Sequence, residues 1–216
     1  MVAGIRIKLC GLTALVDAQV ADQCGVDFLG FNFYPKSPRH LGLETYRAMA
    51  RNLPDRRRVA VCVEPTAAEL GAMQDAGLDF FQIHFRHDLP HETVTGWSSL
   101  VGRDRLWLAP KLPPEMDVPA GLLALADTFL LDTFHAAGFG GSGKTGDWKK
   151  FARHQRLHPG KTWLLAGGLN PDNIGDALKE SGARFVDLNS GVESAPGVKD
   201  HAKLRLLAER LRACRG

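Results

Sequence analysis

The sequence is short of several features that would point to a particular class of protein. It has only four cysteines in 216 residues, Cys10, Cys24, Cys62 and Cys214, and no two of them have C-x-x-C spacing. A zinc or redox motif is therefore not expected. No apolar run approaches the roughly 20 residues of a membrane helix. The first residues also lack the apolar run of a secretory signal. We expect a cytoplasmic protein with reduced thiols, in which Cys24, Cys62 and Cys214 are small buried apolar side chains.

The sequence also lacks a strong charge imbalance. It has 27 basic and 24 acidic residues, a net charge of +3. That is too small to indicate nucleic acid as a partner, although it does not oppose an anionic small ligand. With 44% apolar and 24% charged residues, the chain has the composition of a globular domain. Disorder and fibrous structure are excluded, and the length suffices for a core without disulfides or metals.

Short apolar runs, rich in β-branched and aromatic residues, alternate with amphipathic stretches along the chain. Because the runs lack clean alternation, they are typical of parallel strands covered on both faces. We expect strands at 5–10, 27–31, 58–63, 79–83, 105–109, 128–131, 162–166 and 185–188. Helices are expected at 14–24, 43–53, 67–76, 149–157, 172–180 and 199–213, and none is assigned after Ile83 or Ala109 because Pro, Gly and Asp are frequent there.

A faint internal repeat supports this organisation. The sequences Gly-Val-Asp-Phe from Gly25, Gly-Leu-Asp-Phe from Gly77 and Gly-Ala-Arg-Phe from Gly182 each lie between a helical stretch and a strand. Glycine is the expected residue just past a helix. The separations of 52 and 105 residues (77 − 25 and 182 − 77) correspond to about two and four units of 26. Eight such units predict a single (β/α)8 TIM barrel domain over residues 1–216; the alternative is an open doubly wound sheet.

In such a barrel, reactive groups lie where the strands end. Cys10 ends the first run and Asp132 follows the sixth. A thiol with a lowered pKa can act as a base or nucleophile, and a partly buried carboxyl can act as a general acid. Each also has a plain structural alternative, because Cys10 could be a core residue and Asp132 could cap the next segment.

Candidate anion contacts occupy several of the same loops. Lys36 and Arg39 follow the second run, and Arg39 can grip a carboxylate or phosphate with two hydrogen bonds. Gln82 and His84 alternate to one side of the fourth run, where His84 could equally be a core histidine. Residues 138–145 match the phosphate-loop pattern G-x-x-x-x-G-K-[ST], but they follow the sixth strand and do not open directly into a helix. We interpret them as an active-site loop with Lys144 as a substrate contact, with a nucleotide site as the alternative.

The last two loops are rich in small residues. Gly167 and Gly168 end the seventh run, while Ser190 and Gly191 follow the eighth. In barrels these two loops often bind phosphate through backbone N–H groups. Together they predict a phosphate site.

These segments form one set that resembles the phosphoribosylanthranilate isomerase family of tryptophan biosynthesis. The similar stretches lie in family order along nearly the whole chain. They are KLCGLT (8–13), GFNFYPKSPRHL (30–41), QIH (82–84), LLDT (130–133), GGSGKTGDW (140–148), LAGGLNPDNI (165–174) and VDLNSGVESAPGVKDHAKL (186–204).

The resemblance implies a TIM barrel that performs an Amadori rearrangement of N-(5′-phosphoribosyl)anthranilate without a metal or other cofactor. It implies that Asp132 is the acid, Cys10 the base and Arg39 the residue facing the anthranilate carboxylate. The remaining implied contacts are Gln82, His84, Lys144 and Asp187 for the substrate, and Gly141, Gly167, Gly168, Ser190 and Gly191 for its phosphate. The expected state is a monomer or a homodimer, with no nucleic-acid or membrane partner.

Two rival interpretations remain. The similar isomerase of histidine biosynthesis performs the same rearrangement on another substrate, but its family has Asp where Cys10 stands. The other rival is a phosphate-binding barrel with an altered substrate or lost activity, which the presence of both Cys10 and Asp132 argues against.

Overall fold

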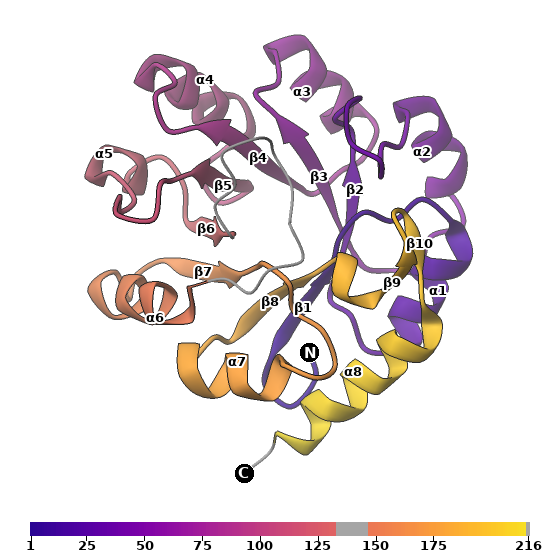
Figure 1. Ribbon diagram of the computed structural model, residues 1–216. Coiled ribbons are helices and arrows are strands. Elements are labelled where there is room, and N and C mark those ends of the chain that lie inside the picture. The colour runs from indigo at the N-terminus through magenta and orange to yellow at the C-terminus, as the bar shows by residue number, and fades with distance from the viewer. Residues whose placement is uncertain (133–146, 215–216) are drawn as a thin grey trace.

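The computed structural model describes residues 1–132 and 147–214, and the fold is a closed barrel of parallel strands surrounded by helices (Figure 1). β1 pairs with β8, with Lys8 beside Asp187, and this pairing closes the barrel. The open-sheet alternative is therefore wrong. The barrel strands are β1 (Arg6–Leu9), β2 (Phe28–Asn32), β3 (Arg57–Val63), β4 (Phe80–Arg86), β5 (Leu106–Lys111), β6 (Thr128–Leu131), β7 (Thr162–Leu165) and β8 (Phe185–Leu188).

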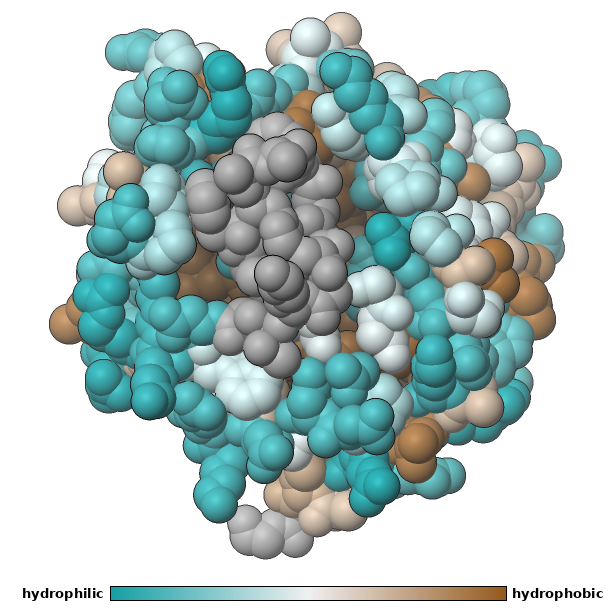
Figure 2. Space-filling view, in the orientation of Figure 1, coloured by the Kyte–Doolittle hydropathy of each residue, from teal (hydrophilic) through white to brown (hydrophobic). Residues whose placement is uncertain are grey.

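The helices lie outside the strands, and hydrophilic side chains cover much of their rim on the face shown in Figure 2. After β8 the chain forms a short 3-10 turn, η1 (Ser190–Val192), and an antiparallel hairpin of β9 (Glu193–Ala195) and β10 (Val198–Lys199). The helices are α1 (Leu15–Gln23), α2 (Leu43–Ala50), α3 (Ala67–Asp75), α4 (His91–Val101), α5 (Ala120–Leu123), α6 (Trp148–Leu157), α7 (Ile174–Ser181) and α8 (His201–Ala213). No helix in the described ranges is long and apolar enough to cross a membrane.

The glycines of the internal repeat take the conformation that the sequence predicts. Gly25, Gly77 and Gly182 have φ angles of 83°, 80° and 67°, and each lies at the end of a helix. Side chains with a Cβ rarely adopt this left-handed region. The repeat therefore marks three equivalent helix-to-strand turns of the barrel.

Inside the barrel, aromatic rings fill the end opposite the loops that follow the strands. Phe28, Phe80, Trp107 and Phe185 pack with ring centroids 5.1–5.7 Å apart. Arg6 covers Phe185, with its guanidinium carbon 4.5 Å from the ring centroid. The barrel is thus filled by side chains at the amino ends of the strands, and its interior has room for a ligand at the carboxyl ends.

The structure corrects two sequence-based expectations. A full helix, α4, follows β4, and a single turn, α5, follows β5, in the segments where no helix is expected. Cys214 is exposed, whereas Cys24 and Cys62 are buried as expected. All four thiols are free.

Candidate active site

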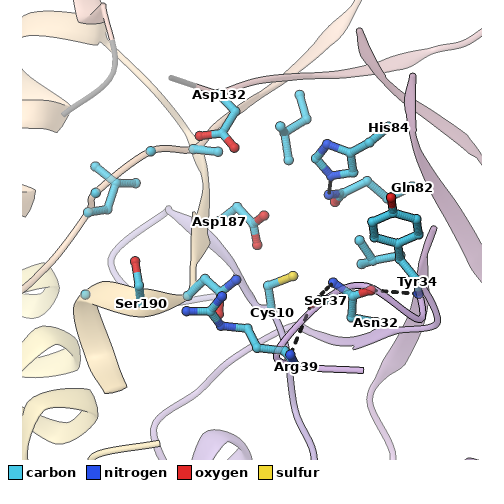
Figure 3. A pocket seen from close by; sticks show the side chains of 18 of the residues that line it. Cys10, Asn32, Tyr34, Ser37, Arg39, Gln82, His84, Asp132, Asp187 and Ser190 are labelled. Carbon is cyan, nitrogen blue, oxygen red and sulfur yellow. Dashed lines mark hydrogen bonds between the residues drawn. The ribbon is translucent and has the colours of Figure 1, made fainter. Parts of the chain in front are cut away.

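A pocket opens at the carboxyl ends of the strands, where the barrel core gives way to polar side chains (Figure 3). It is lined by all the predicted site residues that the structure describes: Cys10, Arg39, Gln82, His84, Asp132, Gly167, Gly168, Asp187, Ser190 and Gly191. The other two, Gly141 and Lys144, lie outside the described residues, as does the phosphate-loop pattern at 138–145. Figure 3 shows Asp187 between Asp132 and Cys10, so Asp132 and Cys10 face the pocket from different sides.

Cys10 immediately follows β1 and is buried at the base of the pocket. Burial raises the pKa of its thiol above the ordinary value, while the nearby Lys8 ammonium acts in the opposite direction by stabilising the thiolate. Lys199 also favours the thiolate, and Asp187 opposes it. Burial is the largest effect on the pKa of Cys10, and Lys8 and Lys199 are the groups that favour the thiolate that a base requires.

Lys8 is fully buried on β1, two residues before Cys10. Its Nζ donates a hydrogen bond to Asp187 Oδ1 at 2.8 Å. Although burial alone would lower it, Asp187 keeps the pKa of Lys8 above its ordinary value. Gly30 on β2 makes room for this side chain, since a Cβ there would lie 2.9 Å from Lys8 Cε. The floor of the pocket thus holds a buried Lys8–Asp187 pair, in which burial outweighs the effect of Lys8 and raises the pKa of the Asp187 carboxyl.

Gln82 and His84 lie side by side on β4, as their alternation predicts. Gln82 Nε2 is 2.8 Å from His84 Nε2. Because the amide nitrogen is the donor, this imidazole nitrogen is the acceptor. Burial, with a contribution from Lys8, lowers the pKa of His84 to about 4. His84 is therefore neutral near pH 7 and can serve as a hydrogen-bonding group there.

Arg39 extends into the pocket from the loop after β2 and is held by Glu193 of β9. Its Nε donates to Glu193 Oε1 at 2.9 Å, and its Nη2 donates to Oε2 at 2.6 Å. Gly11, with φ 70°, leaves space for it, because a Cβ there would lie 2.7 Å from Arg39 Cδ. Glu193 also accepts a hydrogen bond from Lys199 at 2.7 Å, and Lys199 donates to Asn189 Oδ1 at 3.0 Å.

The loops after β7 and β8 approach each other closely. Gly167 and Gly168 have φ angles of 95° and 60°. A Cβ on Gly191 would lie 2.0 Å from the carbonyl oxygen of Leu169, so only glycine fits there. These glycines line the pocket together with Ser190. Backbone of this kind can approach a phosphate group.

The sequence analysis missed four residues that shape this site: Lys8, Gly11, Glu193 and Lys199. Lys8 carried a usable signal, since it alternates with Cys10 along one strand and so faces the same side. Glu193 and Lys199 flank the Pro196-Gly197 pair, which is typical of a turn between paired strands. Their contact with Arg39 had no such signal, because Arg39 and Glu193 are 154 residues apart.

No group of three His, Cys, Asp or Glu side chains suited to a metal ion occurs in residues 1–132 and 147–214.

Comparison with known proteins connects this pocket to one family. Residues 7–210 match the family model of N-(5′-phosphoribosyl)anthranilate (PRA) isomerase. The N-(5′-phosphoribosyl)anthranilate isomerase of Cereibacter sphaeroides is 36% identical over 209 residues, which cover 94% of this chain and 96% of the relative.

Solved structures of phosphoribosylanthranilate isomerases are also similar to this chain. The dimeric phosphoribosylanthranilate isomerase of Thermotoga maritima, solved as monomers, is 31% identical with a TM-score of 0.79, and the match covers 97% of this chain and 99% of that one. A phosphoribosylanthranilate isomerase in complex with reduced 1-(o-carboxyphenylamino)-1-deoxyribulose 5-phosphate is 29% identical with a TM-score of 0.76, at the same coverage. Family model, sequence relatives and barrel geometry converge, and the chain belongs to the N-(5′-phosphoribosyl)anthranilate isomerase family.

Proposed function

We propose that this chain is an isomerase of tryptophan biosynthesis. It converts N-(5′-phosphoribosyl)anthranilate into 1-(2-carboxyphenylamino)-1-deoxyribulose 5-phosphate. The observation that carries the proposal is the placement of Cys10, after β1, and Asp132, after β6, on one pocket whose other walls offer anion contacts. Family membership supports the same reaction.

Asp132 acts as the general acid. It donates a proton to the furanose ring oxygen as the bond between that oxygen and C1′ breaks, which leaves an open-chain iminium ion. The exposure of Asp132 at the pocket rim gives it access to solvent for reprotonation.

Cys10, as the thiolate, then removes the proton from C2′. The electron pair of that C–H bond forms the C1′–C2′ double bond, and the iminium π pair returns to nitrogen. The enolamine formed in this way becomes the ketone when its hydroxyl loses a proton and C1′ gains one. Because the iminium itself accepts the electrons, the reaction requires no cofactor.

The substrate has two anionic ends, and the pocket has a candidate contact for each. Arg39 binds the anthranilate carboxylate, because a guanidinium matches a carboxylate in shape and charge. Gly167, Gly168, Ser190 and Gly191 bind the phosphate through backbone and hydroxyl groups. Gly141 and Lys144, which lie outside the described residues, are further candidate contacts by family resemblance. Between the two ends, Asp187, Gln82 and neutral His84 face the sugar hydroxyls.

A cytoplasmic location follows from this role, since the substrate is a phosphorylated metabolite. The family contains a dimeric member in Thermotoga maritima. We leave both a monomer and a homodimer open for this chain.

The test is turnover of enzymatically generated phosphoribosylanthranilate, followed by the loss of its fluorescence. The wild-type protein should consume it, while Cys10→Ala and Asp132→Asn should each lose about 100-fold or more in kcat, the usual contribution of a general acid or base. Cys62→Ala is the matched control, because Cys62 is also a buried thiol but does not line this pocket. A folded wild-type protein without turnover would refute the proposal. Thermal stabilisation by a nucleotide would instead favour the nucleotide-site alternative.

A further inference from the structure

Glu193 occupies one whole edge of the Arg39 guanidinium. Both carboxylate oxygens take part, receiving Nε and Nη2 at 2.6–3.1 Å. The side chain of Glu193 is only 4% exposed and that of Arg39 only 14%. A charge-assisted, two-point contact of this kind fixes the plane of a guanidinium as well as its position. Arg39 is thus held in a single orientation before any ligand arrives.

The opposite edge of the same guanidinium is open. Within the described residues, no hydrogen bond involves Nη1 of Arg39. Figure 3 shows the guanidinium projecting into the pocket between Cys10 and Ser190. A ligand carboxylate can therefore approach the edge that Glu193 does not use.

Lys199 prevents Glu193 from cancelling the charge of Arg39. Its fully buried Nζ contacts Glu193 Oε1 at 2.7 Å. Together Arg39 and Lys199 lower the pKa of the Glu193 carboxyl, although burial alone would raise it. Among Arg39, Lys199 and Glu193, two cations and one anion leave one net positive charge, although burial lowers the pKa of Lys199. That charge matches a single carboxylate on the ligand.

We propose that Glu193 is the positioning residue for carboxylate recognition, and that it acts through Arg39. This inference rests on the proposed function, in which Arg39 binds the anthranilate carboxylate. Glu193 and Lys199 belong to the hairpin β9–β10 that directly follows Ser190 and Gly191. The segment after β8 therefore carries two of the proposed phosphate contacts, Ser190 and Gly191, and also orients the proposed carboxylate contact, Arg39.

The test compares two ligands that differ only in the carboxylate. They are 1-(2-carboxyphenylamino)-1-deoxyribitol 5-phosphate and its phenylamino counterpart, with affinities measured by calorimetry. The first variant is Glu193→Gln. The second is Glu193→Gln combined with Lys199→Met, which keeps the net charge of the cluster at +1 but removes the orienting contact. Arg39→Lys, alone and with Glu193→Gln, completes a double-mutant cycle.

The wild-type protein should prefer the carboxylate ligand. Both Glu193 variants should lose about tenfold or more in affinity for it, the value of a charged hydrogen bond, and stay within about twofold for the phenylamino ligand. The second ligand also reports whether each variant remains folded. Glu193→Gln should have little further effect once Arg39 is lysine.

Equal losses for both ligands would overturn the proposal, because a merely structural residue would affect both. An undiminished effect of Glu193→Gln in the Arg39→Lys background would also overturn it. If the wild-type protein shows no preference for the carboxylate ligand, the role of Arg39 is wrong and this inference falls with it. Turnover of phosphoribosylanthranilate by that same protein would show that the proposed activity nevertheless stands.

Discussion

Replacement of Lys8 by methionine should strongly destabilise the fold, although the side chains are similar in size. Lys8 is completely buried. It donates a hydrogen bond to the Asp187 carboxylate at 2.8 Å and also interacts with the Cys10 thiol. At an effective dielectric of about 20 their attraction is roughly 6 kcal/mol, which largely offsets the cost of burying both charges. Removing one partner leaves the desolvated carboxylate uncompensated. We expect the free energy of unfolding at pH 7 to fall by about 3–5 kcal/mol.

The pH dependence of this loss has a definite sign. In the native protein burial already raises the pKa of Asp187, against the opposing effects of Lys8 and Lys199. Removal of Lys8 takes away the larger of these opposing charges and raises that pKa further. The carboxyl is then neutral in both states below about pH 4, so the penalty is absent there and grows as the pH rises through the raised pKa. Urea unfolding followed by the fluorescence of the four tryptophans measures it.

The matched control is Lys8→Met combined with Asp187→Asn, which removes both charges. That variant should regain most of the lost stability, because no unpaired charge remains buried. A loss below about 1 kcal/mol in Lys8→Met, or an equal loss in the double variant, would refute the reasoning that a buried ion pair forms the floor of the pocket.

Three further predictions concern other parts of the molecule. Gly191→Ala should raise the KM for the phosphorylated substrate about tenfold or more, because its Cβ would displace the Leu169 carbonyl; an unchanged KM in steady-state kinetics would contradict this. In the native protein, a thiol reagent should label exposed Cys214 rapidly and buried Cys24 and Cys62, which do not line the active-site pocket, only on unfolding; mass spectrometry can localise the labels. Because burial lowers the pKa of His84 to about 4, His84 costs no stability above about pH 6.5, where it is neutral in both states; stability then falls as the pH drops toward 4, because the unfolded chain takes up a proton that the folded protein does not. Accordingly, His84→Asn should flatten the stability profile over that interval in urea titrations.

The sequence predicted the barrel because its units repeat, and it failed where composition obscured a periodic pattern. In α4 the buried residues Val94, Trp97 and Val101 follow helical spacing. Pro90 and Gly96, however, made the segment resemble a loop. Tertiary packing of Trp97, whose indole N–H donates to the Pro65 carbonyl at 2.9 Å, outweighs the cost of that glycine. The turn α5 is too short for periodicity to reveal.

Cys214 shows a different limit of sequence-based prediction. A cysteine near the end of an amphipathic helix has no local feature that distinguishes a buried position from an exposed one. α8 packs Leu204, Leu207 and Leu211 inward, and Cys214 follows after the last buried position of that stripe. The prediction that Cys214 is buried, made from the general tendency of thiols, was therefore wrong, because the buried stripe of α8 ends before this residue.

The ends of the strands were predictable, whereas the charges that support them were not. The residues at the carboxyl ends of the strands could be predicted to line the pocket, since the barrel brings all of these ends to one face. Which cation faces which anion depends on contacts between distant segments. Lys8 and Asp187 meet because β1 pairs with β8, 179 residues further along the chain.

Arg39 and Glu193 meet because the hairpin after β8 folds back over the loop after β2. These supporting pairs also explain how the barrel holds so many charges at its upper end. Each buried charge that would be costly alone has an opposite partner, and the remaining positive charge faces the pocket where an anionic substrate supplies the last counterion. In such an enzyme the remaining positive charge of the pocket is neutralised only when the anionic substrate binds. Ligand binding should therefore stabilise the fold as well as bring the substrate to the catalytic groups.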